Sequence, residues 1–353
     1  MSGAPIHAAE RRIVRRLRAE GAVSPGAAEP LEGLWGLQRR RLPRMIARGI
    51  VREASPGRYY LDEDAWDAYR SQQVRIALVL AGVLLLVGLV VFALTGRVGA
   101  DSVRWDVVRP EVAKGTVTQV TLDDTQARRA RKAWVYTPSS YEAASDVKHH
   151  LLILFDGADY TADIPAPTIL DNLHAARAIP PTVAVMLDTA DGRIADLANH
   201  QVFADFVAKD LVPWAQARYR IDRSPSSTIV AGYSAGGLAA AYVAFRHPDA
   251  FGNVLSQSGA FWRGNEGASS PVEWLTAQFR STPRLPLRFY IEVGGNETGT
   301  TAGGPVFIET NRRLRDALEQ KGYPLQYVEV PGAVHNPAHW RTQLGDGLIF
   351  LSH

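Results

Sequence analysis

Nineteen residues without a charge, IALVLAGVLLLVGLVVFAL at positions 76–94, divide this sequence into two unequal parts. A helix of this length spans about 28 Å at ~1.5 Å per residue, close to the ~30 Å hydrocarbon core of a bilayer. A buried helix of a globular domain rarely stays apolar on every side for so long. The segment therefore predicts a transmembrane helix over residues 76–95, followed by a linker over residues 96–114.

The distribution of charge predicts how this helix is oriented. Residues 1–75 contain fourteen arginines, no lysine and nine acidic residues, a net charge of +5, whereas the whole chain carries +3. By the positive-inside rule, residues 1–75 are expected in the cytoplasm and the larger part outside the cell membrane. A cleaved signal peptide ending at Val98-Gly99-Ala100 is the alternative, but its charged leader would be far too long.

The segment before the apolar run has the pattern of a small folded module. Residues 10–20 and 37–50 are predicted amphipathic helices, the second with Ile46 on its apolar side, and residues 50–61 a β-hairpin. Asp62 is expected to cap a last helix. Helices followed by a hairpin resemble a winged-helix module. We expect its arginines to contact anionic lipid headgroups, with nucleic-acid binding as the alternative.

From residue 115 onward, apolar runs alternate with amphipathic segments. Strands are predicted at residues 117–122, 131–136, 151–155, 182–187, 227–231, 254–257, 288–293 and 326–330. Helices are predicted at residues 202–219, 236–246 and 308–321, the first kinked at Pro213. The alternation predicts an α/β fold over residues 115–353, a mostly parallel sheet with helices on both faces.

The clearest chemical motif is Gly232-Tyr233-Ser234-Ala235-Gly236, between a predicted strand and a predicted helix. Glycines at this spacing allow a sharp turn that lifts the serine hydroxyl clear of the sheet at a helix N-terminus. The motif alone could be an ordinary turn, but its strand–helix setting predicts a nucleophile. In α/β hydrolases, which use this turn, an acid and then a histidine follow the serine along the chain.

A serine hydroxyl needs a base that removes its proton. His335 lies in the loop after the strand 326–330 and is the expected base, with His339 as the alternative. The acid that orients the base is expected beyond the carboxyl end of a strand, where catalytic groups of open α/β sheets gather. Glu297, just past the strand 288–293, is the expected acid, with Glu292, Asp316 or no acid at all as the alternatives.

The oxyanion of the tetrahedral intermediate needs backbone donors. The expected donors are the amides of Ala235, next to the nucleophile, and of Ala158, after the strand 151–155. Further candidate substrate-binding residues are Gly157, Tyr233, Trp262 and Arg193. Trp262, Arg193 and Arg263 favour an aromatic or anionic substrate.

The chain has no cysteine, which excludes thiol chemistry, and it has no apparent metal-binding cluster.

Three segments, 154–157, 231–238 and 255–262, resemble the enterochelin-esterase-like branch of the α/β hydrolases, which includes the esterase D relatives. The similarity extends over about residues 117–350. It implies a serine ester hydrolase that works without a cofactor. It also implies a catalytic triad of Ser234, Glu297 and His335.

Two classes of function follow from these features. The first is a membrane-anchored serine esterase that acts outside the cytoplasm on a siderophore, sugar or lipid ester. An acyltransferase is its close variant, in which an alcohol replaces water. The second is a one-pass sensor, in which the hydrolase-like domain binds a ligand and residues 1–75 signal inside the cell.

Overall fold

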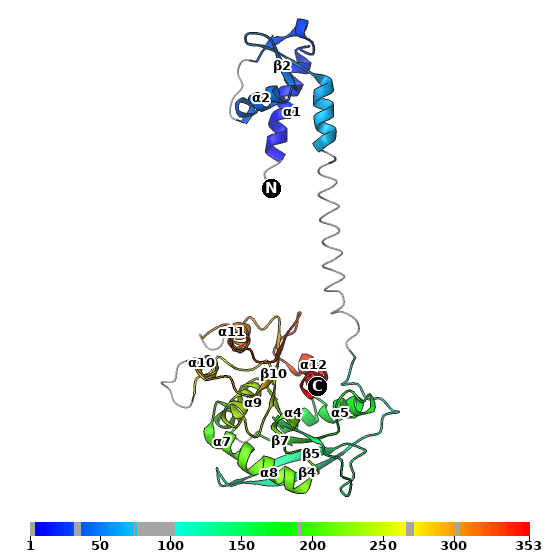
Figure 1. Ribbon diagram of the computed structural model, residues 1–353, viewed down its shortest axis with the longest axis vertical. Helices are drawn as coiled ribbons and strands as arrows, with labels where there is room; N and C mark the ends of the chain where they lie inside the picture. The colour runs from blue at the N-terminus through cyan, green and yellow to red at the C-terminus, as the bar shows by residue number, and fades with distance from the viewer. Residues whose placement is uncertain are drawn as a thin grey trace. The chain divides into compact units, whose positions relative to one another are not determined.

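The computed structural model describes residues 4–31, 37–73, 75, 103–189, 192–265, 272–300 and 304–353 (Figure 1). The chain forms two compact units, Met1–Ser102 and Val103–His353. The predicted membrane helix at residues 76–95 lies outside the described residues. Within the described ranges, no helix is both long and apolar enough to cross a bilayer.

The N-terminal unit combines helices with a small antiparallel sheet. Its elements are α1 (Ala4–Ala19), a 3₁₀ turn (Pro25–Ala27), β1 (Glu29–Pro30), α2 (Leu37–Ala47), β2 (Val51–Ser55), β3 (Arg58–Leu61) and a helical stretch over residues 63–73. The strands lie in the order β1-β3-β2, and both neighbouring pairs are antiparallel. The predicted hairpin is confirmed as β2 and β3.

The helices of this unit share one apolar core. Leu17 of α1 is fully buried, and Met45 of α2 belongs to the same cluster. The sequence predicts Ile46 on the buried side of α2, but Ile46 is 36% exposed, because successive helical residues are rotated by about 100°. Asp62 caps the next helix as predicted: its Oδ1 accepts a hydrogen bond from the Ala65 amide at 3.0 Å.

The C-terminal unit is built on an eight-stranded sheet. Its strands are β4 (Thr116–Asp124), β5 (Arg129–Thr137), β6 (His150–Phe155), β7 (Thr182–Leu187), β8 (Thr228–Tyr233), β9 (Asn253–Gln257), β10 (Arg288–Gly294) and β11 (Leu325–Val330). The order is β11-β10-β9-β8-β6-β7-β5-β4. The pairs β4–β5 and β5–β7 are antiparallel and the other neighbours are parallel, which confirms the predicted mostly parallel sheet.

The central strands are apolar on both faces because helices cover both. Along β6, Leu151 and Ile153 belong to one core cluster, and Leu152 and Leu154 belong to the other. All four side chains are fully buried. Successive side chains of a strand point to opposite faces, so a strand covered on both sides reads as a continuous apolar run.

Two sets of helices provide this cover (Figure 1). Residues of α6 (Arg193–Leu197), α7 (Gln201–Phe206), α8 (Val212–Arg218), α9 (Ala235–Arg246), α10 (Trp274–Ser281) and α11 (Phe307–Gln320) enter one cluster. Residues of α4 (Gly157–Thr161), α5 (Ala166–Ala175) and α12 (Pro337–Ser352) enter the other. The single helix predicted over residues 202–219 consists of α7, a π-helical turn over Val207–Leu211, and α8.

Candidate active site

Ser234 lies between the last residue of β8 and the first residue of α9. Its backbone has φ +53° and ψ −118°, a conformation that is strained for a residue with a side chain. Gly232 makes the turn possible, since a Cβ there would lie 2.5 Å from the carbonyl carbon of Gly236. The Ser234 amide donates a hydrogen bond to the Gln257 carbonyl at 2.8 Å. The serine therefore has the strand–turn–helix setting that the sequence predicts.

His335 and Glu297 come together from neighbouring strand ends. Glu297 follows β10 and His335 follows β11, and these strands are parallel and aligned so that Gly294 pairs with Val330. The Nδ1 atom of His335 lies 2.6 Å from Oε2 of Glu297. A proton on Nδ1 satisfies this contact and leaves Nε2 of the imidazole free to accept another proton.

The surroundings of Glu297 keep its carboxylate ionised. Its side chain is 1% exposed, and Oε1 accepts hydrogen bonds from the Ser258 hydroxyl at 2.6 Å and the Gly294 amide at 2.8 Å. Burial opposes ionisation, but the hydrogen bonds from His335, Ser258 and Gly294 outweigh it and hold the pKa of Glu297 below its ordinary value. Glu297 can therefore orient the imidazole and stabilise its charged form.

The imidazole ring of His335 is held between two aromatic side chains. Phe307 lies at 4.9 Å and Trp340 at 5.0 Å between ring centroids, both in edge-to-face geometry. The Trp340 indole N–H donates a hydrogen bond to the Ser258 hydroxyl at 2.9 Å. Ser258 thus connects the ring that packs on His335 with the carboxylate that binds it.

Ser258 and Phe307 are site residues that the sequence analysis does not single out. Ser258 directly follows β9, with φ +48°. The carboxyl ends of parallel strands meet at one edge of the sheet, where site residues gather. The position of Ser258 directly after a predicted strand was therefore the signal that could have identified it. Phe307 begins α11, and the sequence contains no local signal for its contact with His335.

A cavity of about 440 Å³ joins the three predicted catalytic residues. Ser234, Glu297 and His335 line it together, and Trp262 and Arg263 form another part of its wall. The predicted triad residues, far apart in sequence, are therefore at one cavity. Hydrogen bonds between catalytic groups are often long in a structure without substrate and shorten when substrate binds.

The two predicted oxyanion donors lie at adjacent helix starts. Ala235 is the first residue of α9, and Ala158 lies in the first turn of α4, where amides have no acceptor within the helix. A Cβ on Gly236 would lie 3.3 Å from Oδ2 of Asp156, so the two turns are in contact. Gly157 is buried against β7: a Cβ there would lie 2.3 Å from the Met186 carbonyl oxygen.

The other predicted substrate-binding residues occupy different surroundings. Trp262 lines the cavity. Tyr233 stacks on Trp340 at 4.4 Å between ring centroids, and its hydroxyl donates a hydrogen bond to Asp159. Arg193 forms a two-point ion pair with Asp156, at 2.8 and 2.6 Å. Tyr233 and Arg193 thus support the loop after β6 from beside the cavity.

The alternative base and acid, His339 and Glu292, form a buried pair beside Glu297, whose Oε1 lies 3.8 Å from Nε2 of His339. Nε2 of His339 lies 3.4 Å from Oε2 of Glu292, and the side chains are 6% and 0% exposed. Burial raises the pKa of Glu292, although His339 and Gln257 partly oppose this. Neither residue lines the cavity with Ser234, so His335 and Glu297 are the better placed pair.

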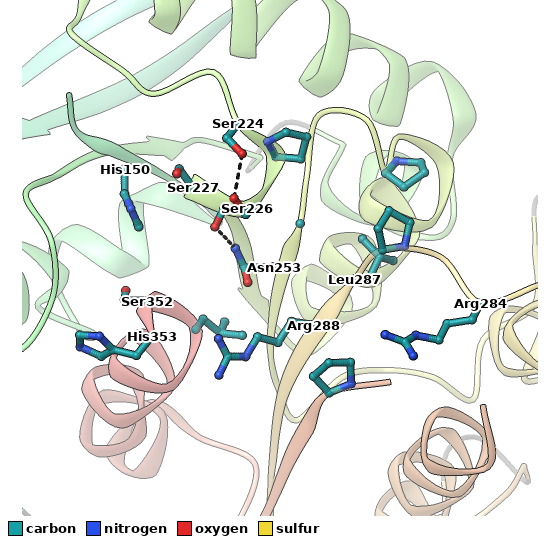
Figure 2. A pocket seen from close by; sticks show the side chains of 16 residues that line it. His150, Ser224, Ser226, Ser227, Asn253, Arg284, Leu287, Arg288, Ser352 and His353 are labelled. Carbon is teal, nitrogen blue, oxygen red and sulfur yellow. Dashed lines mark hydrogen bonds between the residues drawn. The ribbon is translucent and has the colours of Figure 1, made fainter. Parts of the chain in front are cut away.

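A second hollow, of about 630 Å³, lies at the opposite edge of the sheet (Figure 2). It is lined by residues at the amino ends of the strands, among them His150, Asn253 and Arg288. Two of its hydroxyl groups contact each other: Ser224 Oγ lies 2.8 Å from Ser226 Oγ, as the dashed line in Figure 2 shows. The serine that shares a cavity with the His335–Glu297 pair is Ser234, at the other edge of the sheet.

The sheet is mostly parallel and covered on both faces. A serine lies at a strand–helix turn, and a histidine–carboxylate pair lies at later strand ends. Together these features define an α/β hydrolase. The Esterase family model, described as "Putative esterase", matches residues 125–351. The chain belongs to this esterase family.

Individual relatives agree with this assignment. The iron(III) enterobactin esterase of Escherichia coli (strain K12) is 29% identical over 252 residues, which are 70% of this chain and 59% of that protein. The chain thus spans less than two thirds of this relative. The enterobactin esterase of Shigella flexneri, solved in the presence of enterobactin, has a TM-score of 0.60 at 26% identity, covering 71% of this chain and 62% of that one.

A more distant likeness concerns the fold alone. The CE1 ferulic acid esterase of Anaeromyces mucronatus, solved in complex with ferulic acid, has a TM-score of 0.57 at 18% identity. The match covers 70% of this chain and 94% of that chain.

Proposed function

We propose that the C-terminal unit hydrolyses carboxylic esters through an acyl-enzyme on Ser234. One observation carries the proposal: the buried, ionised Glu297 holds His335 at 2.6 Å in the same cavity as the strained Ser234. The arrangement supplies a nucleophile, a base and a group that orients the base. Membership of an esterase family supports the same reaction class.

The reaction proceeds in two halves. The Ser234 Oγ attacks the ester carbonyl carbon while Nε2 of His335 accepts its proton. The tetrahedral intermediate collapses as the bond to the alkoxy oxygen breaks, and the imidazolium returns the proton to the leaving alkoxide. Water, deprotonated by His335, then attacks the acyl-serine, and the acid leaves as Ser234 regains its proton.

Backbone amides complete this mechanism. The Ala235 and Ala158 amides are the proposed donors to the oxyanion, supported by their positions at the starts of α9 and α4. Removing one donor from such a site typically costs about 10²–10³-fold in kcat. Neither donor uses a side chain, so Ala235→Ser or Ala158→Ser would leave the donors in place.

The substrate is proposed at the level of its class. Among the relatives, the iron(III) enterobactin esterase of Escherichia coli is named for a small-molecule ester. We propose a small-molecule ester, from a siderophore, sugar or lipid. Acyl transfer to an alcohol is the same chemistry with a different second nucleophile, and product analysis in the presence of added alcohols separates the two.

The setting of the enzyme is part of the proposal. We propose that residues 76–95 anchor the chain in the cell membrane, with residues 1–75 in the cytoplasm and the esterase unit outside. The uncharged run and the arginine excess before it support this. The helices and three-stranded sheet of the N-terminal unit are consistent with a winged-helix-like module, and its arginines suit anionic headgroups.

Substitution of the nucleophile and the base tests the reaction. In the full chain, Ser234→Ala and His335→Ala are each expected to lower kcat for 4-nitrophenyl esters by about 10⁴–10⁶-fold. Ser224→Ala, an exposed serine at the other edge of the sheet, is the matched control and should keep full turnover. Full turnover in Ser234→Ala would refute the proposal.

A further inference from the structure

Arg263 occupies a fixed place in the wall of the cavity that holds Ser234 and His335. Its guanidinium lies over the Trp262 ring, 4.5 Å from the ring centroid. Its backbone amide donates a hydrogen bond to the Ala260 carbonyl at 3.1 Å, and Asn199 Nδ2 donates to the next carbonyl, that of Gly264, at 2.9 Å. The guanidinium thus packs on Trp262, and the backbone at and after Arg263 is held by hydrogen bonds.

The charge of Arg263 is not neutralised by the described part of the chain, in which it forms no ion pair. Its Nε is buried without a hydrogen-bond partner, and its side chain is half-buried. Burial lowers the pKa of Arg263, and the nearby Arg193 lowers it further. A partly desolvated cation without a partner is unfavourable until an anion reaches it.

The neighbouring carboxylates are already occupied. Glu297 is bound by His335, Ser258 and the Gly294 amide. Both oxygens of Asp156 accept from Arg193. The amide of Glu273 bonds to the Trp262 carbonyl, but both of its carboxylate oxygens pair with Arg313, at 2.7 and 2.8 Å. These three carboxylates are thus paired with other groups, and none of them forms an ion pair with Arg263.

We propose that Arg263 is a specificity-determining residue that selects esters carrying a carboxylate on the acyl or the alcohol part. This inference rests on the proposed function, because it assumes that the ester bond is cleaved at Ser234. A guanidinium binds a carboxylate through two parallel N–H donors, which form a fork. The contact with Trp262 restricts the orientation of this fork. A neutral ester of the same shape leaves the cation unpaired in the cavity.

Matched ester pairs test this selectivity. The acyl pair is 4-nitrophenyl hydrogen adipate and 4-nitrophenyl hexanoate, and the alcohol pair is 4-acetoxybenzoate and its methyl ester. For the full chain, kcat/KM should favour the charged member of at least one pair. In Arg263→Gln the ratio of charged to neutral kcat/KM should fall about 10- to 100-fold, as expected for losing hydrogen bonds to a charged group.

Three further measurements sharpen the result. The fall in kcat/KM for the charged ester should come mainly from a higher KM. A contact that is equally strong in the ground state and the transition state affects substrate binding and leaves kcat unchanged. Arg263→Lys should restore part of the ratio, because it keeps the charge but not the fork. Arg280→Gln, an exposed arginine on α10 outside the cavity, is the matched control and should leave both pairs as in the unmodified chain.

An unchanged ratio in Arg263→Gln overturns the inference, whether both members keep or both lose activity. The inference is also tested without turnover, by titrating benzoate and benzamide into Ser234→Ala and into Ser234→Ala combined with Arg263→Gln. Binding of benzoate that disappears with Arg263 supports it, and binding of benzoate and benzamide that is insensitive to Arg263 rejects it. Absence of ester turnover in the unmodified chain would count against the proposed function alone.

Discussion

Glu292 and Glu297 are five positions apart, and their surroundings give them opposite protonation behaviour. Glu292 sits inside β10 and is fully buried, and burial raises its pKa although His339 opposes this. Glu297 sits beyond the strand end, and there the hydrogen bonds outweigh burial and lower its pKa. Environments that separate two carboxyl pKa values in this way mark which group works as the ionised partner of a histidine.

Glu297→Gln removes the negative charge beside His335 and keeps the shape of the side chain. We expect kcat for ester hydrolysis to fall by as much as about 10⁴-fold, because the imidazole loses the partner that fixes its tautomer and stabilises its charge. The measurement is steady-state hydrolysis at neutral pH. Activity within a few-fold of the unmodified chain would instead indicate a serine–histidine dyad.

The same variant should change the pH dependence of stability. The pKa of Glu297 is lower in the folded state than in the unfolded state, so its contribution is present above the unfolded value and is lost as the pH falls through the folded value. Glu297→Gln should lack this acid-side loss in denaturant titrations at a series of pH values. Glu292→Gln is the control. This variant still contains Glu297, so its free energy of unfolding should still fall at acid pH. The raised pKa of Glu292 means that its ionised form destabilises the fold, so removing it does not remove that fall.

At the scale of elements, helix α12 (Pro337–Ser352) was not predicted from the sequence. It begins two residues after His335, and Asn336 caps it by accepting a hydrogen bond from the Ala338 amide at 2.9 Å. Two glycines, Gly345 and Gly347, interrupt its apolar pattern, and both are buried. They allow close approach: a Cβ on Gly345 would lie 2.3 Å from Cδ1 of Trp105. A helix that packs through glycine lacks the local signal of a helix.

Gly345→Ala separates helix propensity from packing. Propensity alone predicts a gain of about 1 kcal/mol in the free energy of unfolding. The contact with Trp105 predicts a loss of about 1–3 kcal/mol, because the ring and the helix must move apart. We expect the loss, measured by chemical denaturation of the full chain. Gly299→Ala, where a Cβ meets no atom within 4 Å, should change stability little, and a stabilised Gly345→Ala would contradict the packing argument.

At the scale of the whole molecule, each of the two compact units has its own apolar core. Ile13, Leu17 and Met45 belong to the core of the first unit, and two further clusters lie on either side of the large sheet in the second. Separate cores are what a chain needs if its two parts are to fold in different compartments. In the sequence, the apolar run at residues 76–94 lies between the core residues of the first unit, which end at Tyr69, and those of the second, which begin at Trp105.

Reporter fusions test the proposed topology. Alkaline phosphatase fused after residue 353 should be active, because this enzyme matures only outside the cytoplasm, and a fluorescent protein fused before residue 1 should fluoresce in the cytoplasm. Deleting residues 76–94 should abolish the phosphatase signal. Fluorescence from a fusion after residue 353 would show that the esterase unit stays inside the cell and would refute the topology.

Local patterns in the sequence determined a large part of this protein. Alternating apolar runs predicted the parallel sheet, and the glycines around Ser234 predicted the turn, because strand periodicity and backbone strain depend on neighbouring residues only. Position relative to strand ends was enough to favour His335 and Glu297. The strands, the turn at Ser234 and the residues that follow strand ends can all be recognised from the spacing of neighbouring residues.

Only the tertiary structure decided which distant side chains meet. Ser258 contacts Glu297 and Trp340, and Phe307 packs on His335. Arg193 pairs with Asp156, whereas Arg263 forms no ion pair with the described residues. Each of these contacts joins segments that are far apart in the sequence. Their partners depend on the order of the strands and on the path of each loop. No local pattern encodes that arrangement, because it is set by the packing of the whole domain.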